Sequence, residues 1–183
     1  SYSEDANGTK DVSDLILIHV GDSSKVSDEQ TDIASDRIDE IISVYKNPNV
    51  VIYSETATHV PSQLFDDIVT GYGSLTYVQN NVTLYFSSTV ISGLDIPQIG
   101  SSISIEPTDI PEAYSEVMAE SNVYDINIVV NGQKVHDVFH EPVPVTVEYP
   151  LTEDQDESKI HVYYLGDDGV ELLEHQYSDG SIR

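Results

Sequence analysis

A chain of 183 residues with 39% hydrophobic residues can bury one sizeable core, or two small ones, without help from a metal or a disulfide. The 33 acidic residues against 7 lysines and arginines give a formal net charge of −26, which repels phosphate backbones and therefore excludes nucleic acid as a partner. The absence of cysteine excludes thiol catalysis, thiolate metal sites and disulfides.

The first half of the sequence mixes strand and helix patterns. Residues 1–12 are polar and predict a flexible lead-in. The apolar run at 15–20 predicts a strand, and apolar residues at helical spacing within 31–45 predict an amphipathic helix that Pro48 ends. A β-branched strand is expected at 50–54.

A short helix and a hairpin are expected next. The stretch VPSQLFDDIVTGYG at 60–73 places its apolar residues at helical spacing, and we assign the end of this helix to a left-handed Gly71. The segments SLTYV and VTLYF are separated by Gln79, Asn80 and Asn81, a polar turn that predicts a β-hairpin.

Strands dominate the remainder of the chain. Turn residues in VNGQ at 130–133 and GDDG at 166–169 indicate further hairpins, while PEAYSEVMAES at 111–121 fits a helix. The other expected strands are 102–105, 124–130, 145–149, 160–165 and 171–174.

These elements predict an α+β fold that is mostly β. A mixed α/β subdomain at 13–95 is expected to precede an Ig-like antiparallel β-sandwich at 96–183, with the boundary between Gly93 and Gly100.

Ser23 raises the hypothesis of a serine acyl hydrolase. The apolar strand before it delivers a Gly-Asp-Ser turn, as in one class of esterases, and Asp137 and His140 have the Asp-x-x-His spacing that such enzymes use to take up the serine proton. No Gly-x-Asn-Asp block completes an oxyanion hole, and the sequence around His140 predicts strands. The hydrolase therefore stays an alternative, and Asp22 and Ser23 equally suit a turn.

Two stretches, one with histidines and one with acidic residues, are candidate metal-binding sites. His136 and His140 would share a face of a helix, but the nearby sequence is extended. Asp154, Asp156 and Ser158 alternate like the first ligands of a calcium loop, although Lys159 replaces the required glycine. We expect no EF-hand and no obligatory cofactor, and keep calcium as an alternative with these weak candidate ligands: Asp154, Asp156, Asp167 and Asp168.

Tyrosine is the enriched aromatic residue, with 12 copies against 3 phenylalanines and no tryptophan. Exposed tyrosines can stack on sugars or contact proteins. Tyr163 and Tyr164 are adjacent on an expected strand, so they point to opposite faces, and one of the two is expected in the core.

Three segments resemble a module of Gram-positive cell-surface and S-layer-type proteins. They are VVIYSETATHVPSQLFDDIVTGYGSLTYVQNNVTLYFS, VYDINIVVNGQKV and PVPVTVEYPLTEDQDESKIHVYYLGDDGVELLEHQYSDGSI, which together cover about half of the chain. Related sequences complete the last hairpin with a His-Phe-Ser strand that is not present here. The resemblance implies an extracellular accessory module at the cell surface, and it carries over no catalytic residue.

The leading functional expectation is a non-catalytic extracellular module of a bacterial surface protein, acting as a spacer, stalk or adhesion element. Its partner would be cell-wall or host glycan, or another surface protein. No stretch approaches the roughly 18 apolar residues of a membrane span, so we expect no membrane insertion by this segment. A glycan- or calcium-binding accessory domain is the alternative.

Overall fold

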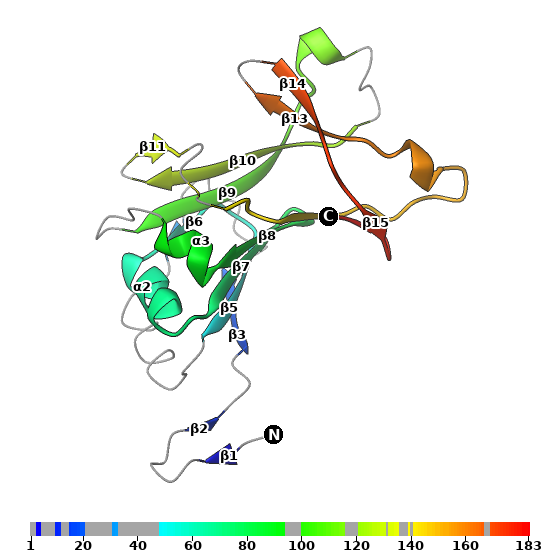
Figure 1. Ribbon diagram of the computed structural model, residues 1–183. Coiled ribbons are helices and arrows are strands. Elements are labelled where there is room, and N and C mark those ends of the chain that lie inside the picture. Colours follow the sequence, from blue (N-terminus) through cyan, green and yellow to red (C-terminus); the bar gives the residue numbers. More distant parts are fainter. Residues whose placement is uncertain are drawn as a thin grey trace.

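The protein is an α+β protein dominated by β-strands, as predicted (Figure 1). The computed structural model describes the side chains of residues 48–93, 100–115, 121–130, 132–135, 139, 141–166 and 169–183, and the backbone of four strands before residue 48. Two large sheets and two two-stranded sheets contain the described strands. An Ig-like sandwich is consistent with this arrangement.

The seven-stranded sheet has the order β15-β16-β12-β8-β7-β5-β3. Strands β3, β5 and β7 run parallel to one another, and each successive pair from β7 through β8, β12 and β16 to β15 is antiparallel. The strands are β3 Leu15–Val20, β5 Asn49–Ser54, β7 Ser74–Gln79, β8 Val82–Ser87, β12 Val145–Glu148, β15 Tyr177–Ser178 and β16 Ser181–Ile182.

The five-stranded sheet has the order β11-β10-β9-β6-β4. Its strands are β4 Thr31–Asp32, β6 Thr58–Val60, β9 Ser101–Thr108, β10 Val123–Val130 and β11 Gln133–Lys134. Both large sheets contain strands from each side of residue 96, so the two expected subdomains share their sheets.

Two further sheets have two strands each. β1 (Ser3–Glu4) pairs with β2 (Lys10–Asp11) within the stretch expected to be a lead-in. β13 (Val162–Gly166) pairs with β14 (Gly169–Leu173), and Figure 1 shows this hairpin apart from the large sheets. Gly166 pairs with Gly169, as the predicted hairpin requires, and Asp167 and Asp168 lie outside the described residues.

One core lies between the two large sheets and the helices α2 (Ser62–Thr70) and α3 (Ser88–Ser92). Alternate residues of β5, β7 and β8 are buried, because successive side chains of a strand point to opposite faces. A fully buried aliphatic or aromatic side chain contributes about 2 kcal/mol. The buried apolar residues are Val50, Ile52, Val60, Leu64, Phe65, Ile68, Leu75, Tyr77, Val82, Leu84, Phe86, Val90, Ile91, Ile103 and Ile105.

The end of α2 corrects the prediction for Gly71. Gly71 has a φ of −87°, whereas Tyr72, with a φ of 53°, is the left-handed residue. The Gly73 N–H donates to the Ile68 carbonyl at 2.8 Å, which closes the helix in the manner of a Schellman motif. Glycine is needed at Gly73 instead, because a Cβ there would lie 1.9 Å from the Pro48 carbonyl oxygen.

The predicted hairpin between β7 and β8 is confirmed. Gln79 pairs with Val82, and Asn80 and Asn81 have φ values of 51° and 64°. Positive φ at both central residues is the geometry of the tight hairpin turn whose twist matches the strands, and asparagine tolerates it.

The structure differs from the prediction at two expected helices. Of the helix expected at 31–45, Thr31–Asp32 form the strand β4 instead, because they pair with β6, and residues 33–45 lie outside the described residues. In the 111–121 stretch a short 3₁₀ helix, η1 (Glu112–Tyr114), is present, and 116–120 lie outside the described residues. The helix α3 was not predicted, because its β-branched residues favour strands in isolation. Among the described residues, no helix has the length and apolarity needed to cross a membrane.

A buried hydrogen-bond network joins the two large sheets. The Tyr77 hydroxyl on β7 lies 3.2 Å from the Thr56 carbonyl oxygen, 2.9 Å from Gln79 Oε1 and 3.0 Å from the Ile103 carbonyl oxygen on β9. Gln79 Oε1 also accepts from the Ile105 N–H at 2.9 Å. No buried side-chain polar atom in the described part of the chain lacks a partner. The network therefore fixes how β7 sits against β9.

Burial of Tyr77 predicts a loss of stability at high pH. Desolvation raises the pKa of Tyr77 above its ordinary value of 10.0, and the Glu106 carboxylate adds to this rise, while hydrogen bonds to Thr58 and Ser54 lower it. Above pH 10.0 the folded state then holds a proton that the unfolded state releases. The stability from this group is complete below that pH and is lost as the pH rises through the folded pKa.

We therefore expect the free energy of unfolding of Tyr77→Phe to decrease less than that of wild type between about pH 9 and about pH 11. Urea titrations at several pH values measure this decrease. Tyr72→Phe, at a position 85% exposed, is the control and should keep the wild-type slope. An unchanged slope in Tyr77→Phe would contradict the assignment.

Candidate interaction surface

The β13–β14 hairpin carries apolar side chains on both faces. Its antiparallel register pairs Tyr163 with Leu172 and Tyr164 with Glu171, and side chains of paired residues share a face. One face holds Tyr163, Leu165, Val170 and Leu172. The other face holds Val162, Tyr164, Glu171 and Leu173.

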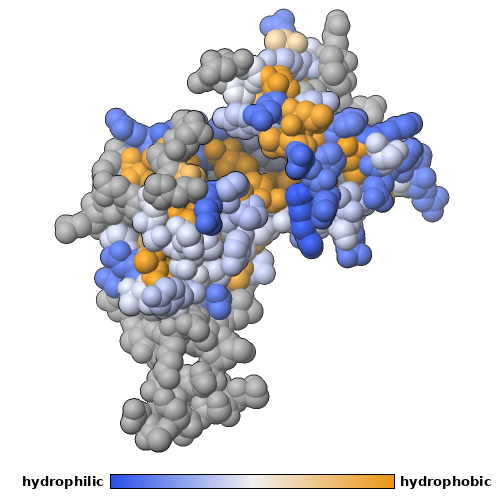
Figure 2. Space-filling view, in the orientation of Figure 1, coloured by the Kyte–Doolittle hydropathy of each residue, from blue (hydrophilic) through white to orange (hydrophobic). Residues whose placement is uncertain are grey.

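Five of the apolar side chains are exposed, and we call them the hairpin surface: Tyr163, Tyr164, Val170, Leu172 and Leu173. Leu172 is 59% exposed and Tyr164 is 53% exposed. Figure 2 shows hydrophobic atoms gathered over the hairpin, with hydrophilic residues around them. Contiguous exposed apolar side chains of this kind mark contact sites in soluble proteins.

The hairpin surface corrects the prediction that one of Tyr163 and Tyr164 lies in the core. Tyr163 is 41% exposed and Tyr164 is 53% exposed. The reason is that β13 and β14 form a sheet of their own, so no second described layer covers either face.

Two side chains hold the base of the hairpin. The His175 ring lies between the strands that enter and leave it, with Nε2 3.0 Å from the Ile160 carbonyl oxygen and Nδ1 3.2 Å from the Leu173 carbonyl oxygen. The Tyr177 hydroxyl donates to the Tyr149 carbonyl at 3.1 Å. The hairpin is thus presented from an ordered base.

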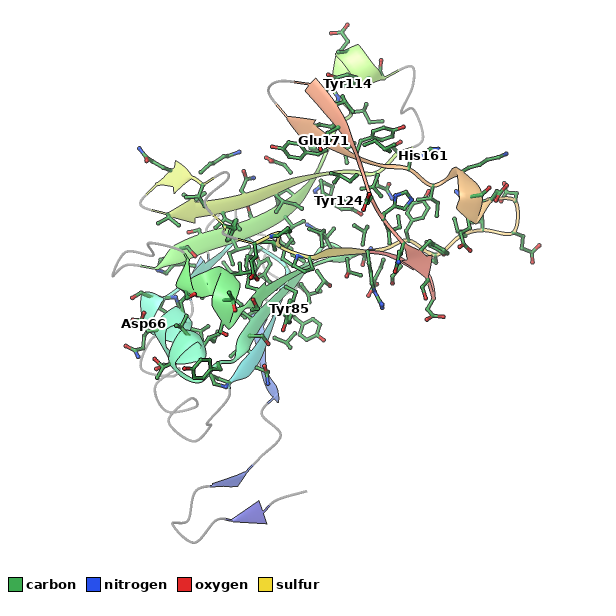
Figure 3. The ribbon with its side chains drawn as sticks, viewed as in Figure 1. Asp66, Tyr85, Tyr114, Tyr124, His161 and Glu171 are labelled. Carbon is green, nitrogen blue, oxygen red and sulfur yellow. The ribbon has the colours of Figure 1, made fainter. Side chains whose placement is uncertain are left out.

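An open groove of about 690 Å³ lies at this base. The His161 ring is 6.3 Å from the Tyr163 ring, centroid to centroid, and Figure 3 shows His161 where the chain enters the hairpin. The groove is lined by two leucines and by polar and charged side chains. The lining residues are His161, Leu172, Leu173, Glu174, His175, Gln176 and Arg183.

The calcium candidates Asp154 and Asp156 act as local turn caps. Asp154 Oδ1 accepts from the Thr152 hydroxyl at 2.6 Å, and this bond lowers the pKa of Asp154 below its ordinary value of 3.8. Asp156 Oδ1 accepts from the Ser158 hydroxyl at 2.8 Å and from the Ser158 N–H at 3.0 Å, and both bonds lower the pKa of Asp156. These carboxylates hold the loop before the 3₁₀ helix η2 (Glu157–Lys159).

The remaining predicted site residues lie outside the described residues: Ser23, Asp137, His140, Asp167 and Asp168. The hydrolase alternative and this part of the calcium alternative stay predictions. In the described ranges no three His, Asp or Glu side chains gather in a way that could hold a metal ion.

The hairpin surface was missed as a site at the sequence level. The pattern VYYLGDDGVELL predicted its two strands and its turn, but a strand that is apolar on both faces usually belongs in the middle of a fold. The one available signal was that both adjacent tyrosines are amphipathic residues that suit contact surfaces.

Comparison with known proteins found no matching family model, no significantly similar curated protein and no significantly similar solved structure. The resemblance to Gram-positive surface proteins therefore stays a prediction, and the hairpin surface is the feature from which a function can be argued.

Proposed function

We propose that this chain is a non-catalytic, extracellular module of a bacterial surface protein and that it acts in adhesion by binding another protein. The observation that supports the proposal is the hairpin surface, which leaves Tyr163, Tyr164 and Leu172 open to solvent on a hairpin with an ordered base. Tyrosine is enriched at protein–protein contacts because each ring adds a large apolar area at a low cost in conformational entropy.

A partner at the hairpin surface is expected on physical grounds, because a two-stranded sheet is marginally stable by itself. Each exposed leucine or tyrosine leaves apolar area in water, at about 25 cal/mol per Å². A partner that covers both faces of the hairpin would recover this free energy and order the hairpin further. A spacer without a contact role has no need of such a surface.

The test is binding of the labelled protein to a panel of Gram-positive cells and host epithelial cells, before and after the cells are treated with protease. Leu172→Ser and Tyr164→Ser should each weaken binding about tenfold or more, because truncation of a central contact residue costs about 1–4 kcal/mol. The melting temperature should stay close to wild type, since both positions are exposed in the free protein.

Tyr72→Asn is the matched control, because Tyr72 is 85% exposed, lies at the end of α2 and has a φ of 53° that asparagine accepts. It should bind like wild type. Binding that is equal in the hairpin variants and wild type would contradict the proposal. Binding that survives protease but not glycan removal would instead favour the glycan-binding alternative.

A further inference from the structure

Within the described part of the chain, the outer edges of the β13–β14 hairpin are open. No described strand pairs with either edge, and no described backbone group outside the hairpin bonds to residues 162–173. An open strand edge presents a row of N–H and C=O groups that another extended segment can pair with. The groove at the base of the hairpin lies at the end of β14, where Leu172, Leu173 and Glu174 line it.

The two faces of β14 differ in chemistry. Leu172 belongs to the wholly apolar face, whereas Glu171 stands on the other face beside Tyr164. Side chains of an added strand alternate between the faces with a period of two. A segment that alternates apolar and basic residues would place the apolar ones beside Leu172 and the basic ones beside Glu171.

The charge of the hairpin favours a cationic partner over a second copy of this chain. Residues 162–174 contain four acidic residues, Asp167, Asp168, Glu171 and Glu174, and neither lysine nor arginine. Arg183 contributes one cation to the groove. Two copies would each bring a net charge of −26 to the contact, so repulsion opposes self-association.

We propose that the β14 edge binds an extended, cationic polypeptide segment of alternating apolar and basic residues as a third strand of the hairpin. This inference rests on the proposed function and names the chemical class of the partner. Main-chain hydrogen bonds would supply affinity, and the alternation of side chains would supply specificity.

The experiment uses a displayed library of random peptides, selected on the full chain, followed by affinity measurements with three synthetic peptides. These are a valine–lysine alternating peptide of about eight residues, the same peptide with every backbone amide N-methylated, and a valine–glutamate peptide. We expect selected peptides to be basic and alternating. N-methylation should weaken binding about tenfold or more, because it removes several main-chain hydrogen bonds.

Charge reversal supplies the matched pair of variants. Glu171→Lys should weaken the valine–lysine peptide about tenfold and improve the valine–glutamate peptide. Asp66→Lys makes the same change in net charge on the exposed side of α2, and should alter the affinity about twofold or less. Figure 3 shows Asp66 on α2, away from the hairpin that carries Glu171.

Equal binding of the N-methylated peptide, selection of acidic or non-alternating peptides, no measurable binding, or dimerisation through the hairpin would each overturn the inference. If the cell-binding effect of Leu172→Ser persists in those cases, the proposed function stands with a different partner. If that effect is absent as well, both fail.

Discussion

Replacing Gly100 by alanine is expected to destabilise the protein by about 3 kcal/mol. Gly100 precedes β9 with a φ of +82°, which costs an alanine about 1 kcal/mol. The new Cβ would also lie 2.1 Å from the Val60 carbonyl oxygen and 2.8 Å from Pro61 Cα, where β6 leads into α2. Backbone atoms cannot move aside without shifting the β6–β9 pairing, so overpacking adds about 2 kcal/mol.

Gly132→Ala is the matched control. Gly132 has a nearly equal φ of +75°, but a Cβ there meets no atom of the described residues within 4 Å. It should therefore lose only the conformational part, about 1 kcal/mol. Urea unfolding of both variants gives the two free energies, and equal losses would show that β6 and β9 do not approach each other as described.

Replacing Gln79 by methionine is expected to cost about 2–3 kcal/mol. Gln79 is 1% exposed, and its Oε1 accepts from the Tyr77 hydroxyl and the Ile105 N–H, while its Nε2 donates to Glu106 at 3.0 Å. Methionine keeps the length of the side chain but removes its polar atoms. The Ile105 N–H is then left buried without an acceptor, which costs more than the loss of an exposed hydrogen bond.

Gln63→Met makes the same chemical change on the exposed side of α2, where Gln63 Nε2 donates to Asp67 Oδ1 at 3.0 Å. Its cost should stay within about 0.5 kcal/mol, because water replaces the lost bond. Chemical denaturation again supplies the measurement. A Gln79→Met variant as stable as Gln63→Met would argue against a buried network between the sheets.

Much of the local structure could be predicted from the sequence. The alternation through Val50, Ile52, Leu75 and Tyr77 has the period of a half-buried strand, and the helical spacing of Leu64 and Ile68 placed α2 correctly. Asn80-Asn81 predicted the β7–β8 turn, since asparagine accepts positive φ. These features depend on a few neighbouring residues.

The candidate site could be predicted only in part. The sequence placed the strands and the turn of the β13–β14 hairpin, but it also placed one of Tyr163 and Tyr164 in the core. Their burial depends on whether another layer covers the hairpin. Asp154 and Asp156 alternate like calcium ligands in the sequence, and in the structure one oxygen of each accepts hydrogen bonds from Thr152 or Ser158, so calcium binding stays a prediction.

The sequence by itself determined the longer strands, the helix α2 and the tight turn at Asn80-Asn81. Only the tertiary structure decided that strands from both sides of residue 96 share two sheets, that Tyr77 and Gln79 join those sheets, and that the β13–β14 hairpin stands apart with apolar faces exposed. The physical reason is that secondary structure follows from short-range periodicity, whereas burial depends on contacts between residues distant in the chain, which no local pattern records.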